Sequence, residues 1–144
     1  MHTTQLYDEI YRAITKTASI LELMGLEDAT PLDLAKRVQK RRQPMNIDKS
    51  MPLITFYCPG GRHDSRNDAV YGAGFVFDVY TNDDVELAQD ISTELCELFD
   101  NELANFSGLT TFQTKLQDQY ESLTDRQNVY CYTTVMVFFI GLDD

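Results

Sequence analysis

The sequence predicts one α+β domain, in which a mainly antiparallel sheet of four strands carries a helix packed on one face. Apolar residues recur at helical spacing near the N-terminus and again in the middle of the chain, whereas later stretches are rich in β-branched and aromatic residues. The expected order of elements is α-α-β-β-α-β-β. A chain of 144 residues buries about 68–70% of its unfolded surface, so a single domain over residues 1–144 is expected.

A long amphipathic helix is predicted at the N-terminus, from Thr4 to about Met24. Its residues at three- and four-residue intervals would form one buried stripe, namely Leu6, Ile10, Ala13, Ile14, Thr17, Leu21 and Met24. Gly25 follows as a C-terminal stop, because glycine readily adopts the left-handed conformation that ends many helices.

A shorter helix is predicted from Thr30 to about Gln39, with Thr30 as the N-cap and Pro31 at the first helical position. Its end leads into a basic stretch that holds five of the twelve basic residues, namely Lys36, Arg37, Lys40, Arg41 and Arg42. The helix dipole favours cations at this end. The stretch is therefore either a solvated helix end or an electrostatic contact with an acidic partner, for which a neighbouring copy is a candidate.

Two strands are predicted over residues 52–58 and 70–80. One face of the second strand is apolar, whereas the other carries Gly72 and Gly74, which indicates a bulge or the close approach of another backbone. Residues 59–69 connect the strands. Most hairpin loops have about 2–5 residues, so this longer connection is expected to be functional or mobile.

Residues 59–69 are the only place where catalytic residue types cluster. The connection lacks the spacing of a dinucleotide or phosphate loop, and neighbouring loop residues such as His63 and Asp64 seldom form a nucleophile–base pair. A hydrolase is therefore the weakest hypothesis. Contact with a partner or another subunit is favoured over an uninvolved loop, and its candidate residues are Arg62, His63 and Arg66 together with Lys40, Arg41 and Arg42. No catalytic residue, cofactor or metal ligand is expected, since Cys58 and His63 lack a second ligand pair.

A third helix is predicted from about Asp84 to Asn101, with Asp83 and Glu86 spaced as a capping box. Its expected buried stripe is Leu87, Ala88, Ile91, Leu95, Leu98 and Phe99. The charged residues on the rest of the helix are all acidic, so ion pairs along the helix cannot stabilise it. Packing must therefore hold this helix in place.

The last two strands are predicted over residues 109–120 and 129–140. The first has one polar face and is expected at the edge of the sheet. The second is apolar on both faces and must be covered on both sides, one by the 84–101 helix and the other by the N-terminal helix or the next subunit. If its face with Tyr130, Tyr132, Met136 and Phe138 is buried within one chain, that face is not available for assembly.

The charge of −11 is concentrated in residues 83–144, which hold thirteen acids and two bases. This argues against a general nucleic-acid binder, which needs Lys and Arg to neutralise phosphates. Three cysteines without close pairing are expected as reduced thiols. The N-terminus has no signal-peptide pattern, and no apolar run approaches the roughly 20 residues that span a bilayer, so we expect a soluble protein made in the cytoplasm.

Several motifs along most of the chain follow the pattern of one family. They are Asp33-Leu-Ala-Lys-Arg37, Pro52-Leu-Ile-Thr-Phe-Tyr-Cys-Pro-Gly-Gly-Arg62, Arg66-Asn67, Asp78-Val-Tyr80, Thr81-Asn-Asp-Asp84, Leu98-Phe99-Asp100 and Asn128-Val-Tyr-Cys-Tyr-Thr-Thr134. With the α-α-β-β-α-β-β order, the chain resembles the tail-terminator and tail-completion (head–tail joining) proteins of long-tailed bacteriophages and phage tail-like particles.

The resemblance implies a structural protein of the virion tail, assembled in the cytoplasm of a bacterial host, with no enzymatic activity. It implies a ring, expected to be a hexamer, that caps the tail tube protein and offers a joining surface to the head connector. DNA would pass through without specific binding. We expect either the acidic 84–101 helix, with the candidate residues Glu86, Asp90, Glu94 and Glu97, or the rim of the 109–120 strand to face that channel. The alternatives are a head-side stopper or adaptor, another tail-end component, or a monomeric cytoplasmic binding module.

Overall fold

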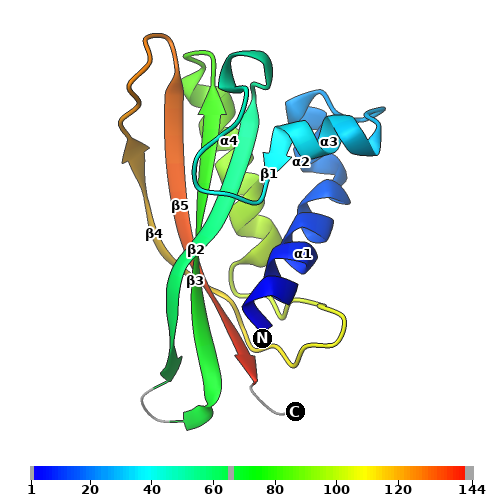
Figure 1. Ribbon diagram of the computed structural model, residues 1–144, viewed down its shortest axis with the longest axis vertical. Helices are drawn as coiled ribbons and strands as arrows, with labels where there is room; N and C mark the ends of the chain where they lie inside the picture. The colour runs from blue at the N-terminus through cyan, green and yellow to red at the C-terminus, as the bar shows by residue number, and fades with distance from the viewer. Residues whose placement is uncertain (1, 65–66, 142–144) are drawn as a thin grey trace.

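In the computed structural model, helices cover one face of a five-stranded sheet (Figure 1). The structure describes residues 2–64 and 67–141, and the side chains of these except residues 2 and 62–68. The helices are α1 (His2–Thr15), α2 (Ala18–Met24), α3 (Pro31–Arg37) and α4 (Val85–Phe99), with a 3-10 turn at Ile47–Lys49. The strands are β1 (Val38–Gln39), β2 (Leu53–Asp64), β3 (Asn67–Thr81), β4 (Lys115–Ser122) and β5 (Tyr130–Gly141).

The sheet has the order β1-β2-β3-β5-β4, so the predicted count of four strands is wrong by one. The extra strand, β1, pairs parallel with β2, and the other pairs are antiparallel. It takes the residues predicted as the end of the second helix. Arg37 ends that helix, because its guanidinium donates hydrogen bonds to the carbonyls of Met24 and Pro52, and Val38 then continues in an extended conformation as a buried strand residue. The N-cap at Thr30 is confirmed, since its hydroxyl accepts from the Asp33 N–H at 3.2 Å.

The predicted N-terminal helix is two helices, α1 and α2, separated at Lys16 and Thr17. Thr17 is extended (φ −91°, ψ 108°), and the hydroxyls of Thr15 and Thr17 donate to the carbonyls of Tyr11 and Ala13. Threonine hydroxyls that bond to the preceding turn compete with regular helix geometry, and β-branched residues also weaken it. The stop at Gly25 is confirmed, because Gly25 is left-handed (φ 70°).

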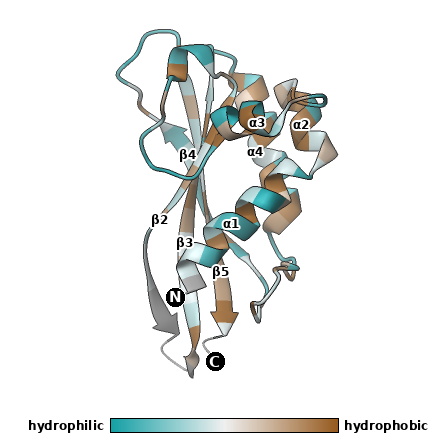
Figure 2. Cartoon of the chain, turned by 45° about the vertical axis from the view of Figure 1, so that its right-hand side comes forward, coloured by the Kyte–Doolittle hydropathy of each residue, from teal (hydrophilic) through white to brown (hydrophobic). Residues whose placement is uncertain are grey.

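Helices α1 and α4 lie on the same face of the sheet (Figure 1), and Figure 2 shows hydrophobic positions recurring along both the helices and the strands. Phe138 of β5 packs the sheet against α4. Its ring centroid lies 5.2 Å from that of Phe99 on α4 and 5.6 Å from that of Phe75 on β3. Tyr7 of α1 packs edge-on against Phe75 at 5.1 Å. Met136 and Phe138 are buried and Tyr130 and Tyr132 half-buried against this core. The face of β5 proposed for assembly is therefore filled within the chain, and the N-terminal helices do not cover its other face.

The predicted capping box of Asp83 and Glu86 is wrong: the N-cap lies one residue later, and its third following residue is the apolar Leu87. Asp84 is the N-cap and accepts from the Leu87 N–H at 3.0 Å, while the hydroxyl of Thr81 accepts from the Asp84 N–H. Asp83 is instead left-handed (φ 55°). Ala88, Ile91, Leu95 and Phe99 of the predicted stripe are buried, whereas Leu87 and Leu98 are half-buried. No helix in the described part of the chain is long and apolar enough to cross a membrane.

The predicted edge strand lies at the sheet edge as β4, but it begins at Lys115 instead of Leu109. Upstream of it, Thr111 and Gln113 make only isolated bridges, to Ile140 and Leu103. The predicted irregular connection 59–69 is also wrong for most of its length. Strands β2 and β3 continue through it, with a bulge between Tyr57 and Gly60, and form a hairpin that extends past the helices (Figure 1).

Candidate assembly surfaces

The face of the sheet opposite the helices has no helix over it in the described part of the chain (Figure 1). Strand register places Tyr57, Val76 and Val135 in one row on this face, and Val137 and Phe139 further along β5. All five are only half-buried, although they are aromatic or β-branched. We call these five residues the open sheet face. Partly exposed apolar residues that lie next to one another make this face a candidate surface for binding another protein.

A buried polar cluster lies on the same side of the sheet, next to these residues. The hydroxyl of Thr133 donates to Asp78 Oδ1 at 2.5 Å, and Ser122 and Thr133 are also hydrogen-bonded to each other. Burial raises the pKa of the Asp78 carboxyl and raises that of the Cys131 thiol to about 12. A thiol with so high a pKa stays protonated, so Cys131 is unsuited to nucleophilic chemistry. Burial also raises the pKa of Cys96, to about 11.

The predicted basic candidates differ in what they contact. Lys40 is paired within the chain: its Nζ lies 2.7 Å from Asp8 Oδ1 and 5.5 Å from the centre of the Tyr11 ring, and it lowers the pKa of Asp8. The guanidinium of Arg42 lies 5.4 Å from the centre of the Tyr57 ring, at the margin of the open sheet face. Arg41 is exposed, and neither arginine makes an ion pair within the described residues. Arg41 and Arg42 are therefore available to a partner, whereas Lys40 is engaged.

The β2–β3 hairpin carries the other basic candidates. Arg62 and His63 belong to β2 and pair in register with Gly72 and Tyr71, while Arg66 lies outside the described residues. Because the hairpin extends past the helices (Figure 1), it can reach a neighbouring molecule. The structure thus places Arg62 and His63 on a strand hairpin, where the sequence predicted a loop.

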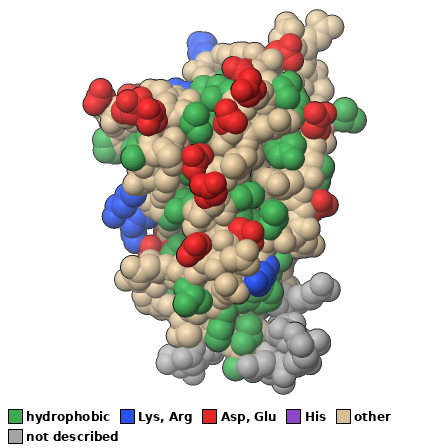
Figure 3. All heavy atoms as spheres, turned by 180° about the vertical axis from the view of Figure 1, so that it is seen from behind, with side chains coloured by type: hydrophobic (Ala, Val, Ile, Leu, Met, Phe, Trp, Pro, Cys, Tyr) green, Lys and Arg blue, Asp and Glu red, His purple; other side chains and the backbone are tan. Residues whose placement is uncertain are grey.

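The channel candidates Glu86, Asp90, Glu94 and Glu97 all belong to α4, and we call them the α4 acidic face. Glu94 is half-buried and the other three are exposed. None makes an ion pair with a described residue. In the view of the molecule from behind, acidic side chains are much more numerous than basic ones, with hydrophobic side chains between them (Figure 3). Such a surface repels phosphate groups.

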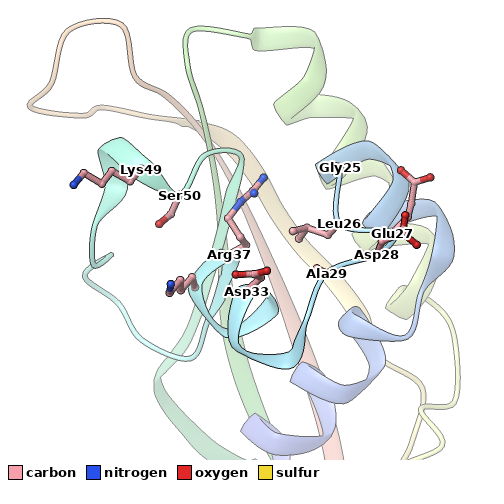
Figure 4. A pocket seen from close by; sticks show the side chains of 10 residues that line it. Gly25, Leu26, Glu27, Asp28, Ala29, Asp33, Arg37, Lys49 and Ser50 are labelled. Carbon is pink, nitrogen blue, oxygen red and sulfur yellow. The ribbon is translucent and has the colours of Figure 1, made fainter.

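Two of the surface pockets lined by described residues lack the composition of a catalytic site. The first, of about 530 Å³, lies between the 25–29 turn and Arg37 (Figure 4). Three basic and three acidic side chains line it, so it favours neither anions nor cations, and Arg37 is already bonded to two carbonyls. The second, of about 420 Å³, lies between α1 and the segment after α4, and Leu103 at its side is 70% exposed. Among the described residues, no group of three or more His, Cys, Asp or Glu side chains could hold a metal ion.

The sequence analysis did not predict that Val135, Val137 and Phe139 lie on the face of β5 that the helices leave uncovered. Both faces of this strand are apolar in sequence, so hydrophobicity could not show which one the helices cover. The usable signal was in β3, where the face opposite the helices carries Gly72, Gly74 and Asp78 in place of large apolar residues.

Comparison with solved structures gives a match to a chain described as "Virion of native gene transfer agent (GTA) particle". The TM-score is 0.65, the sequence identity is 12%, and the match covers 94% of both chains. No protein-family model and no curated protein matches the sequence. At this identity the match shows a common fold, and that fold extends over nearly the whole length of a chain from a phage-like particle.

Proposed function

We propose that this chain is a structural subunit of a phage or phage-like particle, which caps the end of the tail tube as a ring and presents a joining surface to the head connector. The observation that carries the proposal is the common fold with a chain of a gene transfer agent virion over 94% of both chains. The motif resemblance, from residue 33 to residue 134, supports the more specific role at the tail end.

The open sheet face supports a subunit over a monomeric binding module. Tyr57, Val76, Val135, Val137 and Phe139 lie together and are only half-buried, and an isolated subunit gains nothing from leaving them partly exposed. In a ring, each subunit offers one surface to the neighbour before it and a different surface to the neighbour after it. A ring therefore covers one apolar face on every copy.

The charge distribution supports a channel through which DNA passes. The α4 acidic face has no counter-ions among the described residues, and the net charge of the chain is −11. If this face lines the lumen, DNA phosphates are repelled by carboxylates instead of being held by Lys or Arg. The role is structural, and no residue of this chain is assigned to catalysis.

A head-side stopper or adaptor is the second candidate, because ring-forming joining proteins share this size and acidity. Co-expression separates the two roles. A tail terminator is expected to co-purify with the tail tube protein and to appear at one end of the tubes in negative-stain images. Binding to the portal side alone would assign the chain to the head. Failure to bind either one, with the protein folded, would refute the proposed function.

A further inference from the structure

Two of the four glycines in β2 and β3, Gly60 and Gly74, have no side chain of this chain packed over them. A Cβ added at Gly60 or at Gly74 would meet no atom within 4 Å, and neither residue has a left-handed φ. Glycine in a strand interior weakens the strand, since it has no side chain to pack and loses more conformational entropy on folding. Gly60 lies at the β2 bulge, which accounts for a glycine there, whereas Gly74 lies in regular register and points to something outside this chain.

The other two strand glycines give the contrast. A Cβ at Gly61 would lie 2.5 Å from the Tyr71 hydroxyl, and one at Gly72 would lie 3.1 Å from the Phe139 ring. Both are explained by a neighbouring aromatic side chain of the same chain. Gly60 and Gly74 have no such neighbour.

Gly60 and Gly74 are direct cross-strand partners, and Val137 is the partner of Gly74 on the next strand. The row Tyr57–Val76–Val135 lies on one side of them, and Phe139 lies on the other side over Gly72. The result is a gap in the open sheet face, two strands wide and bounded by large apolar side chains. We call Gly60, Gly74 and Val137 the glycine notch.

The margins of the sheet carry opposite charges. On the β2 side, Arg42 lies on the Tyr57 ring beside the notch, and it has no ion pair among the described residues. At the other edge, β4 and the turn after it carry Asp118 and Asp125, which make no described ion pair, while Arg126 on the same turn is already paired with Asp48. In the same region Tyr120 is 45% exposed and Leu123 is fully exposed. At the two margins of the open sheet face, one chain thus presents a recess beside the basic Arg42 and exposed apolar side chains beside the acidic Asp118 and Asp125.

The strand edges themselves are poor candidates for pairing between copies. β4 has a register shift at Gln117, and the outer edge of β2 carries Pro59 within a bulge. Bulges and prolines are devices that prevent edge-to-edge pairing. Strand pairing at these edges is therefore disfavoured, whereas the open sheet face carries no such device.

We propose that the glycine notch receives the β4 margin, around Tyr120 and Leu123, of a second copy of this chain, with Arg42 of one copy facing Asp118 or Asp125 of the next. The contact joins two different surfaces, so it repeats from copy to copy and can close into a ring. The proposal rests on the proposed function, for which it names the surface between subunits.

The first test fills the notch without disturbing the fold. Gly74→Val adds a side chain where nothing lies within 4 Å, so the melting temperature of the monomer should stay the same or rise. The concentration at half-assembly, measured by light scattering, should rise by about tenfold or more, as expected when a packed contact is overfilled. Thr93→Val, at an exposed position of α4 on the other face of the molecule, is the control that places the same side chain outside both the notch and the β4 margin. Wild-type assembly by Gly74→Val, or a wild-type protein that stays monomeric, would overturn the proposal.

A charge exchange identifies the occupant. Arg42→Glu alone and the pair Asp118→Arg with Asp125→Arg alone should each assemble less well than wild type, whereas an equimolar mixture should recover mixed assembly. Melting temperatures of the separate variants exclude misfolding. If neither recovery nor self-assembly occurs but Gly74→Val abolishes co-purification with the tail tube protein, the notch binds the tube. In that case this inference fails while the proposed function stands.

Discussion

Phe138 and Phe139 are adjacent on β5 and belong to opposite faces of the sheet, so they test directly which face forms the core. Phe138 is 2% exposed and its ring packs against those of Phe75, Phe99 and Phe106. Phe138→Ala is expected to cost about 3–5 kcal/mol, the usual range for a buried phenylalanine. Phe139 is half-buried on the open sheet face and covers Gly72, so Phe139→Ala should cost only about 1 kcal/mol in the monomer.

In a domain of this size, each kcal/mol corresponds to about 2–4 °C in melting temperature. Phe138→Ala should therefore melt about 6–20 °C below wild type, and Phe139→Ala about 2–4 °C below it. Both are measured by circular dichroism at concentrations where the protein is monomeric, with Phe138→Leu as a milder variant in case Phe138→Ala does not fold. Phe139→Ala should in addition weaken assembly. Equal losses in the two monomers would mean that the open sheet face is already covered within one chain.

Three further predictions follow from the charged groups. Neutralising the α4 acidic face with Gln and Asn should leave assembly intact and create DNA retention that decreases with salt, measured by filter binding; unchanged retention would refute the channel assignment. Replacing Arg62 and Arg66 by Ala should weaken assembly and leave the melting of the monomer nearly unchanged, and loss of monomer folding would indicate a structural role instead. Burial raises the pKa of Asp78 above its ordinary 3.8, so its contribution to stability decreases as pH rises through that raised pKa. Asp78→Asn should therefore be more stable than wild type near pH 7, with a gain that shrinks towards pH 3.8 in thermal melts, and a gain that grows on acidification would contradict this sign.

Local patterns predicted the elements that carry strong signals. Thr30 caps its helix, Gly25 ends α2, and the apolar stripe of α4 packs on the sheet. The predictions failed where contacts distant in sequence decide the structure. Arg37 ends α3 by bonding to carbonyls of residues 24 and 52, and Val38 becomes a strand because it pairs with Ile54. Neither contact is visible in the local sequence.

The same distinction between local patterns and distant contacts applies to the candidate assembly surfaces. The sequence identified the basic and acidic residues and the two glycines of β3, but it could not show which of them already have partners. Lys40 is paired with Asp8, 32 residues earlier, whereas Arg42 stacks on Tyr57 and remains without a described ion pair. Gly72 is explained by Phe139, whereas Gly74 is not. These distinctions depend on register and packing between strands.

The most direct measurement is the mass of the purified protein in solution, alone and with the tail tube protein, by light scattering together with negative-stain imaging. A ring-forming tail subunit is expected to give a multiple of 16.5 kDa, and ring-shaped particles that cap one end of each tube. A single species of 16.5 kDa under both conditions, with the tube ends bare, would contradict both the ring and the role at the tail end.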